Sequence, residues 1–195
     1  MPRLHPKEHC RACFQLLENS SPICQACSTS CTELRLAAVF SYDSPASALI
    51  KQLKYGGREE LAPLMASWMI VQLEDLGFPW PDAIIPVPQS FPRRLVRGLN
   101  PSHQLAAALS KLMRVPLSKP LKRTWTALPQ ASKNARERSR LSKEEFILRP
   151  SVSLTGKKIL IIDDVMTTGT TLKRCAEAIR PAFPYEVYGL GFCLA

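Results

Sequence analysis

Two adjacent carboxylates and a hydroxyl-rich turn follow each other in residues 158–172, KILIIDDVMTTGTTL. The apolar run from Ile159 to Ile162 predicts a short buried strand, and Asp163 and Asp164 come directly after it. A polar turn and a helix-like stretch, LKRCAEAIRPAF, complete the segment. Open α/β sheets bind their ligands at such strand tips. The segment therefore predicts a ligand site.

The turn has the groups that bind a phosphate monoester. It offers hydroxyls, a residue without Cβ, backbone N–H groups and the positive end of a helix dipole. The carboxylates would repel a phosphate, but they suit neighbouring sugar hydroxyls or a magnesium ion. Together these features predict a phosphorylated pentose. A plain strand and N-capped helix is the alternative, although capping needs only one or two such residues. The phosphate-binding candidates are Thr167, Thr168, Gly169, Thr170 and Thr171.

Four cysteines near the amino terminus form a second group with distinctive chemistry. Cys10-x-x-Cys13 and Cys24-x-x-Cys27 are separated by ten residues, and Cys31 lies nearby as a competing ligand. Two such knuckles can supply four thiolates to a tetrahedral zinc ion, and two disulfides are the alternative. The first nine residues contain no apolar signal-peptide core, which favours a cytoplasmic protein with reduced thiols. We therefore expect a structural Zn²⁺.

Length and composition are compatible with one α/β domain and a small appendage. The chain has 195 residues, 46% of them hydrophobic, and no apolar run long enough to span a membrane. Its net charge of +10 comes from residues 93–149, which carry fourteen Lys or Arg and three acidic residues. Solvated surface explains such an excess. The sharper hypothesis is an anionic partner, either a substrate that bears pyrophosphate or a nucleic acid.

The remaining pattern predicts the elements that must position these residues. Apolar spacing indicates a strand in 34–44, and helices on both sides of Gly56-Gly57 within 47–77. DAIIPVP, residues 82–88, predicts a short buried strand, followed by an Arg-rich loop and a helix at 103–113. If this strand is a neighbour of the strand at 159–162, the Arg-rich loop and the hydroxyl-rich turn share one edge of the sheet.

The DDVMTTGTT segment closely resembles the phosphoribosyl pyrophosphate signature of type I phosphoribosyltransferases. The cysteine knuckles, LIKQLKYGG, and IIPVP followed by RRLVRGLN extend the resemblance over nearly the whole chain. They narrow it to the ComF family of competence-associated phosphoribosyltransferase-like proteins. The resemblance implies an α/β fold, with a mostly parallel sheet flanked by helices and preceded by a zinc ribbon. It divides the chain into a zinc-ribbon-like segment, 1–33, and a phosphoribosyltransferase-like domain, 34–195.

The resemblance also assigns roles to residues. Asp163 and Asp164 would face the ribose hydroxyls and favour the positive charge that develops on the sugar, and residues 167–171 would hold the 5-phosphate. Residues 124–145 match the flexible hood that closes over the active site. The further substrate-binding candidates are Lys54 in LIKQLKYGG, and Arg97, Gly98 and Asn100 in the loop that faces the pyrophosphate. The candidates for gripping pyrophosphate or nucleic acid are Arg136, Arg138 and Arg140 in the hood.

Three functions stay open at this point. The first is a phosphoribosyltransferase that uses phosphoribosyl pyrophosphate with Mg²⁺ and displaces pyrophosphate from C1 of the ribose. The second is a non-catalytic single-stranded-DNA-binding accessory protein that retains the phosphate pocket. ComF resemblance implies a role in natural transformation and DNA uptake, with proteins of the competence machinery as partners. The third is a regulator that senses the metabolite without turnover.

Overall fold

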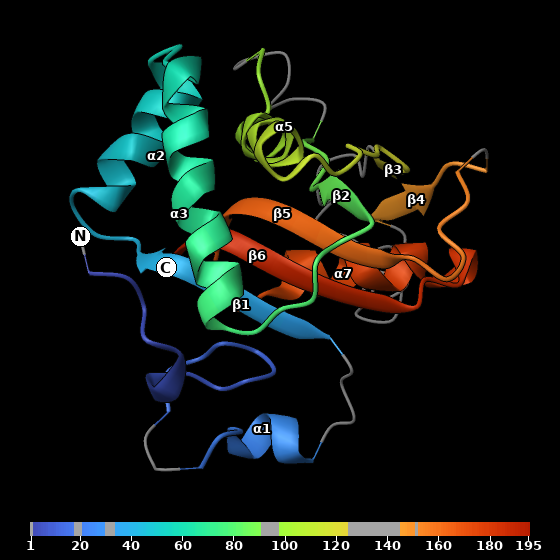
Figure 1. Cartoon of the computed structure of the whole chain (residues 1–195), viewed down its shortest axis with the longest axis horizontal. Coiled ribbons are helices and arrows are strands. Elements are labelled where there is room, and N and C mark those ends of the chain that lie inside the picture. Colours follow the sequence, from blue (N-terminus) through green and yellow to red (C-terminus); the bar gives the residue numbers. More distant parts are fainter. Residues whose placement is uncertain (1, 18–20, 30–33, 91–97, 125–144, 151) are drawn as a thin grey trace, which may run out of the picture.

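A four-stranded parallel sheet forms the centre of the protein in this computed structural model (Figure 1). The strand order is β1-β6-β5-β2. The strands are β1 (Arg35–Ser41), β2 (Ala83–Pro86), β5 (Lys158–Met166) and β6 (Glu186–Leu194). Their centres are almost continuously apolar because both faces of the sheet are covered. The structure describes residues 2–17, 21–29, 34–90, 98–124, 145–150 and 152–195.

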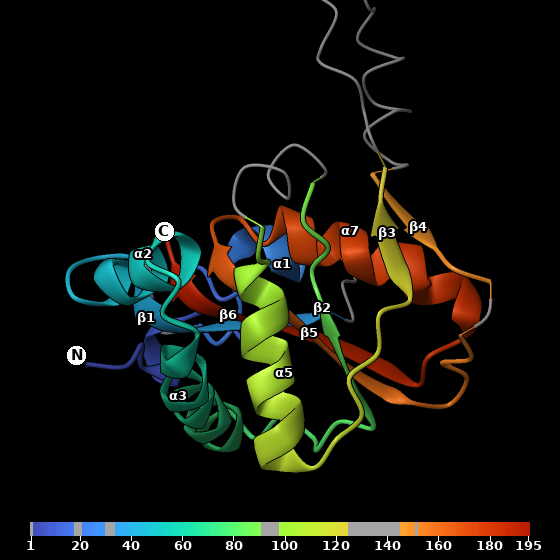
Figure 2. The same ribbon diagram turned by 90° about the horizontal axis from the view of Figure 1, so that it is seen from above.

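Helices cover both faces of this sheet. Figure 2 shows α3 and α5 on one face and α7 on the other. The longer helices are α2 (Ala46–Tyr55), α3 (Ala62–Asp75), α5 (Pro101–Met113) and α7 (Thr170–Ile179), with short 3-10 turns η2 (Glu59–Leu61) and η3 (Arg180–Ala182). Helix α2 ends where Gly56 and Gly57 interrupt the helical pattern, and Pro63 occupies the first turn of α3, where its missing N–H costs nothing.

The amino-terminal segment contains η1 (Pro6–Glu8) and α1 (Gln25–Ser28), and it packs along the outer strand β1. The Leu4 N–H donates to the Val39 carbonyl at 2.8 Å, and the Leu36 N–H donates to the Ala12 carbonyl at 2.8 Å. Phe14 is buried in the same core as the sheet. The predicted boundary at residues 33 and 34 falls beside residues outside the described part, and it stays a prediction.

A separate antiparallel pair, β3 (Leu121–Arg123) with β4 (Phe146–Leu148), lies beside the β2 edge of the sheet. The sequence pattern did not predict these short strands. The Thr124 N–H donates to the Glu145 carbonyl at 2.9 Å, so the pair closes the two ends of the predicted hood. Residues 125–144 of that hood lie outside the described residues.

The predicted α/β class and parallel sheet are confirmed. The condition set above is also met, because β2 pairs with β5 in parallel, so the loop after β2 and the hydroxyl-rich turn follow neighbouring strands. One boundary was wrong, because we predicted that the strand ends before the acidic pair. Strand β5 instead runs to Met166, since β6 is long enough to pair with it as far as Leu194. Helix α5 begins at Pro101 because Asn100 caps it. None of the helices in the described ranges is long and apolar enough to cross a membrane.

Candidate functional site

The two aspartates lie in the last part of β5, where one serine hydroxyl contacts both. Ser102 Oγ donates to Asp163 Oδ1 at 3.0 Å and lies 3.2 Å from Asp164 Oδ1. The Lys54 ammonium, at the end of α2, forms an ion pair with the other oxygen of Asp164. Side chains from α2, α5 and β5 therefore meet at the acidic pair, although they are far apart in the sequence.

Asp163 is an unusual carboxyl group because only 8% of it is exposed. Burial raises the pKa of Asp163 well above its ordinary value, and the negative charge of Asp164 raises this pKa further. The hydrogen bonds from Ser102 and from the Asp164 N–H act in the opposite direction without offsetting the burial. An ionised pair is therefore costly in the ligand-free protein. A ligand that brings hydroxyl donors or a cation would relieve that cost.

A cavity of about 300 Å³ opens over the acidic pair at the carboxyl end of β2 and β5. The polar residues that line it come from six parts of the chain: α2, the residues after β2, the start of α5, β3, β5 and α7. They are Lys54, Gln89, Asn100, Ser102, Arg123, Asp163, Asp164 and Thr171. We call this space the acidic-pair cavity. It unites five of the residues that the sequence singled out, namely the two aspartates, Lys54, Asn100 and Thr171.

The hydroxyl-rich turn, residues 167–171, connects β5 to α7 and lies at the protein surface. Thr167, Thr168 and Thr170 are exposed, and the Thr168 and Thr170 hydroxyls lie 2.7 Å apart. The first intrahelical bond of α7 runs from the Lys173 N–H to the Gly169 carbonyl, at 2.9 Å. Within the described part of the chain, the N–H groups of residues 168–171 have no acceptor. They are available for an anion.

Gly169 occupies a place that no other residue fits well. Its φ of +71° lies in the left-handed region, where a Cβ is unfavourable. A Cβ at this position would also lie 2.3 Å from Leu36 Cδ1, and Leu36 is buried beneath the turn. The glycine therefore permits both the turn and the close approach of β1.

The loop after β2 contributes an architectural residue to the site. Asn100 Oδ1 accepts from the Ser102 N–H at 3.1 Å, and Asn100 Nδ2 donates to the Val87 carbonyl at 2.9 Å. Asn100 thus caps α5, ties it to the end of β2, and holds Ser102 over the aspartates. Gly98 is exposed with a φ of +70°. The other predicted contact of this loop, Arg97, lies outside the described residues, as do Arg136, Arg138 and Arg140.

A second, larger cavity of about 740 Å³ adjoins the first between α5 and the β3–β4 pair. The two cavities share Pro88, Gln89, Asn100 and Arg123. Its charged lining consists of Lys119, Lys122, Arg123 and Arg149, and the described residues that line it include no Asp or Glu. We call it the basic cavity. Arg123 is already paired with Glu145, whereas the other three cations are exposed.

Sequence reasoning missed several residues of this region. The amide of Gln89 is buried between the two cavities and has no hydrogen-bond partner among the described residues. Buried amides without a partner are rare, which makes Gln89 a candidate ligand contact. Ser102 and Arg123 were also missed. For Ser102 the signal was present, because Asn100-Pro101 is a helix-start pattern that places the next residue in the first turn.

The four predicted zinc ligands come together. The sulfurs of Cys10, Cys13, Cys24 and Cys27 all lie within 4.8 Å of one another, with Cys13 and Cys24 at 3.7 Å. Tetrahedral Zn–S bonds of about 2.3 Å imply sulfur separations of about 3.8 Å, whereas a disulfide needs about 2.05 Å. The donor set fits a metal such as zinc, and these cysteines are not disulfide-bonded. Cys31 lies outside the described residues.

Local hydrogen bonds prepare Cys10 for a cation. Burial by itself would raise the pKa of the Cys10 thiol, but N–H groups of Cys13, Cys24 and Ala12 outweigh it and lower that pKa to about 6. The Cys24 N–H lies 3.3 Å from Cys10 Sγ. By contrast, burial and the neighbouring thiols raise the pKa of Cys27 to about 12. Four thiolates together repel one another, so only a bound cation would stabilise them all.

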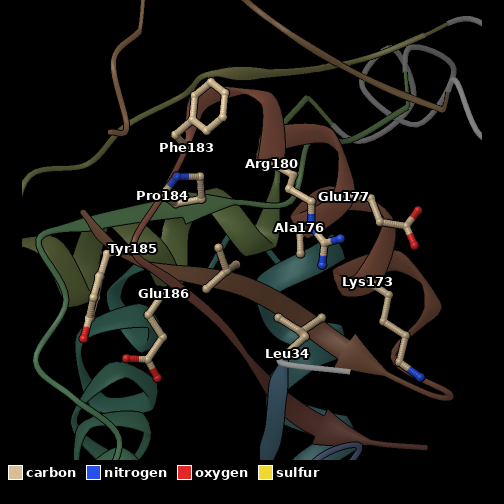
Figure 3. A pocket seen from close by; sticks show the side chains of 10 residues that line it. Leu34, Lys173, Ala176, Glu177, Arg180, Phe183, Pro184, Tyr185 and Glu186 are labelled. Carbon is tan, nitrogen blue, oxygen red and sulfur yellow. The ribbon is translucent and has the colours of Figure 1, made fainter. Parts of the chain in front are cut away.

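A third cavity, of about 590 Å³, lies near the amino ends of β1 and β6. Figure 3 shows its lining, which comes from α7, from the residues that follow it, and from the start of β6. Phe183 and Tyr185 are 75% and 74% exposed there. Charged residues of both signs, including Lys173 and Glu177, also line this cavity. None of its lining residues belongs to the acidic pair or to the hydroxyl-rich turn.

Comparison with known proteins relates this geometry to a family. The model of the phosphoribosyl transferase domain matches residues 95–188. The DNA utilization protein YhgH of Salmonella typhi is 30% identical over 184 residues, which cover 92% of this chain and 74% of the relative. Competence protein F of Haemophilus influenzae is 27% identical over 167 residues, which cover 83% of this chain and 73% of the relative.

A solved structure supports the fold independently. The structure described as the allosteric regulatory enzyme of purine biosynthesis superposes with a TM-score of 0.50 at 17% identity. The match covers 72% of this chain and 29% of that chain. At this identity the likeness shows the fold alone.

Proposed function

Because the chain belongs to the ComF family of phosphoribosyltransferase-like proteins, we propose that its acidic-pair cavity binds phosphoribosyl pyrophosphate with Mg²⁺. One observation carries the proposal. Two aspartates, the first-turn threonine Thr171, and two cations, Lys54 and Arg123, line the same cavity. A carboxylate pair beside the amides at the start of α7 suits a sugar phosphate better than it suits a bare phosphate or a neutral metabolite.

The chemistry of each group decides where the parts of the ligand bind. The 5-phosphate accepts from the N–H groups and hydroxyls of residues 167–171. The ribose hydroxyls donate to Asp163 and Asp164, and the pyrophosphate faces Lys54 and Arg123. Carboxylate oxygens are ligands that Mg²⁺ prefers, and the ion would neutralise the pyrophosphate next to the pair. Asp164 already forms an ion pair with Lys54. Oxygens of the ligand would therefore supply most of the coordination of Mg²⁺.

In a transfer reaction, an acceptor bonds to C1 of the ribose while the bond from C1 to the pyrophosphate oxygen breaks. The carboxylates stabilise the positive charge that develops on the sugar, and the cations stabilise the departing pyrophosphate. The hood, residues 124–145, would exclude water from the reacting carbon. No side chain has to act as a covalent nucleophile in this scheme.

Calorimetry with phosphoribosyl pyrophosphate and Mg²⁺ tests the proposal. Asp163→Asn with Asp164→Asn removes charge from the site, and we expect affinity to fall at least about tenfold, since charged hydrogen bonds are lost. Glu74→Gln with Glu177→Gln removes two exposed carboxylates elsewhere and should leave affinity unchanged. Equal affinity of the two double variants would contradict the proposal. Pyrophosphate release with candidate nucleobases then separates an enzyme from a non-catalytic binder or sensor.

The four-cysteine cluster is proposed to hold one structural Zn²⁺. Its sulfur separations suit a thiolate tetrahedron, and no cysteine of the cluster is spent in a disulfide. Reduced thiols suit the cytoplasm, where we place the protein. A closed set of four sulfurs leaves no open position for a catalytic water.

Single-stranded DNA is the second candidate ligand, and the basic cavity favours it. Three exposed cations, Lys119, Lys122 and Arg149, line that cavity beside the proposed sugar-phosphate site. The names of the relatives point to DNA utilization and competence. A role in DNA uptake, with partners in the competence machinery, would require the chain to contact a nucleic acid backbone.

Binding to a labelled oligothymidylate over a range of salt concentrations tests this second function. Lys119→Ala, Lys122→Ala and Arg149→Ala together should weaken binding and reduce the slope of log affinity against log salt by about two. Lys111→Ala, Arg114→Ala and Lys157→Ala remove the same charge from other exposed positions and should change the slope less. If both triple variants behave alike, the basic cavity is not the DNA site.

A further inference from the structure

The cysteine knuckle touches the hydroxyl-rich turn directly, although the two are far apart in the sequence. Gln15 follows the Cys10–Cys13 knuckle by two residues, and its Nε2 donates to the Thr167 carbonyl at 3.1 Å. This is a side-chain bond to the turn that is proposed to hold the 5-phosphate. The bond uses a carbonyl, so it leaves the N–H groups of the turn available.

The bond from Gln15 fixes a peptide plane. In a trans peptide the C=O and the N–H point in opposite directions, so anchoring the Thr167 carbonyl also directs the Thr168 N–H. That N–H then points away from the knuckle. Gln15 can therefore orient an amide of the phosphate site without contacting the ligand.

A second path joins the knuckle to the same turn through β1. The Ala12 carbonyl, inside the knuckle, accepts from the Leu36 N–H at 2.8 Å. The Leu36 side chain lies against Gly169, where a Cβ would come within 2.3 Å of it. Leu36 is 1% exposed, so it cannot move aside without disturbing the core. The knuckle thus contacts the turn at Thr167 and supports it at Gly169.

The cysteine cluster in turn holds the shape of the knuckle. The Phe14 N–H donates to the Cys10 carbonyl at 2.9 Å, and the Cys10 N–H donates to the Gln15 carbonyl at 2.8 Å. Phe14 has a φ of +61°, which is unfavourable for a bulky residue and needs support from its surroundings. Sulfurs of Cys10 and Cys13 held on one ion would supply that support, and would set the position of Gln15.

We propose that the four-cysteine cluster positions the hydroxyl-rich turn through its Cys10–Cys13 knuckle, with Gln15 as the positioning residue. Metal loading of the cluster would then strengthen the binding of a phosphate ligand at the turn. The identity of the ligand in this inference rests on the proposed function, whereas the positioning of the turn by Gln15 does not. The order of the turn without any ligand is set by the same two contacts. The knuckle therefore orients the hydroxyl-rich turn in addition to stabilising its own segment.

The test compares Gln15→Leu with Gln25→Leu in the full, zinc-loaded chain. Leucine is close in size to glutamine but has no donor, and Gln25 is an exposed residue of α1 in the same segment. Hydrogen–deuterium exchange of a peptide spanning residues 165–172 reports the order of the turn without ligand. Calorimetry with phosphoribosyl pyrophosphate and Mg²⁺ reports the affinity, and zinc content and thermal unfolding report whether the knuckle is intact.

For Gln15→Leu we expect faster exchange in this peptide and an affinity about three- to tenfold lower, the range for one lost hydrogen bond. Zinc content should equal that of Gln25→Leu, which should behave as the wild type. Chelation of the wild-type metal should also speed exchange, and Gln15→Leu should add little to that effect. Unchanged exchange and affinity in zinc-loaded Gln15→Leu would overturn the inference. If exchange is faster in Gln15→Leu than in the wild type, but the wild type binds no sugar phosphate, the positioning role is supported and the proposed function is contradicted.

Discussion

At the scale of residues, Asp163 is placed where its own ionisation is unfavourable. A buried carboxyl beside another carboxyl is a poor choice for stability, and Ser102 compensates only in part. Groups with such shifts concentrate at binding and catalytic sites, because the ligand supplies what the fold lacks. This is the physical reason to regard the acidic pair as functional and not as part of a helix cap.

The raised pKa of Asp163 predicts how stability depends on pH. The unfolded chain releases this proton near its ordinary pKa of 3.8, whereas the folded chain keeps it to higher pH. The folded state therefore binds more protons in this window, and stability is lost as the pH rises through the folded-state pKa. Asp163→Asn cannot ionise. We expect the melting temperature of Asp163→Asn without ligand to rise relative to that of the wild type as the pH increases above that ordinary value.

Thermal unfolding across this pH range measures the effect. Asp43→Asn makes the same substitution at an exposed aspartate and serves as the matched control for the removal of one carboxylate. A difference for Asp163→Asn that shrinks with rising pH would mean that Asp163 is stabilised as a carboxylate in the folded protein.

Residues that lie together in the sequence could be predicted from it. The acidic pair and the threonines are contiguous, so their types and order indicated a sugar-phosphate site. Ser102 could not be assigned to the pair, because 61 positions separate it from Asp163. Gln15 is 152 positions from Thr167, and no local pattern relates them. Only the fold brings such residues together.

At the scale of elements, the β5–α7 connection depends on a glycine that serves two purposes. Gly169 and Gly156 have almost the same φ, +71° and +69°. A Cβ on Gly156 meets nothing within 4 Å, whereas on Gly169 it meets Leu36 at 2.3 Å. Alanine substitutions at the two positions therefore separate the free-energy cost of the left-handed backbone from the cost of the contact with Leu36.

We expect Gly156→Ala to lower the free energy of unfolding by about 1–2 kcal/mol, the cost of a left-handed alanine. Gly169→Ala should lose more, because Leu36 or the turn must also move. Only Gly169→Ala should weaken binding of phosphoribosyl pyrophosphate. Denaturant unfolding and calorimetry measure the two effects. Equal losses of stability, with unchanged affinity, would show that the turn tolerates displacement.

Elements with strong apolar periodicity were predicted well, and short ones were not. The helices α2, α3 and α5 and the strands β1 and β2 follow from spacing, and from Gly and Pro at their ends. Strands β3 and β4 have three residues each and are separated by residues 124–145. Beside this pair, Arg123 and Arg174 form ion pairs with Glu145, and no local pattern reveals such long-range contacts. The end of β5 was misjudged for the same reason, since its partner β6 sets it.

At the scale of the whole molecule, the amino-terminal segment is part of the packed structure. It bonds to β1 at Leu36 and Val39, and Gln72 of α3 donates to the Leu4 carbonyl at 3.0 Å. Phe14 enters the common core. Because this small metal-binding segment shares a core with the larger domain, loss of its metal should also destabilise that domain.

We predict that purified wild-type protein contains about one zinc ion per chain and that Cys13→Ser contains almost none. Cys13→Ser should also unfold at a lower temperature, because the knuckle loses its cross-link. Cys175→Ser is the control, since it changes a buried core cysteine outside the cluster and should keep the metal. Metal analysis with thermal unfolding measures both. Full zinc occupancy in Cys13→Ser, or none in the wild type, would contradict the assignment.

The central claim is that the backbone amides of residues 168–171, which have no acceptor among the described residues, bind the phosphate of a sugar phosphate beside the two aspartates. Titration of the ¹⁵N-labelled protein with phosphoribosyl pyrophosphate and Mg²⁺, followed by NMR, observes these amides directly. We predict saturable shifts at the amides of residues 168–171 and at Asp163 and Asp164, and none around Phe183 and Tyr185. Saturation with the turn amides unmoved, or no shift at any concentration, would contradict the account.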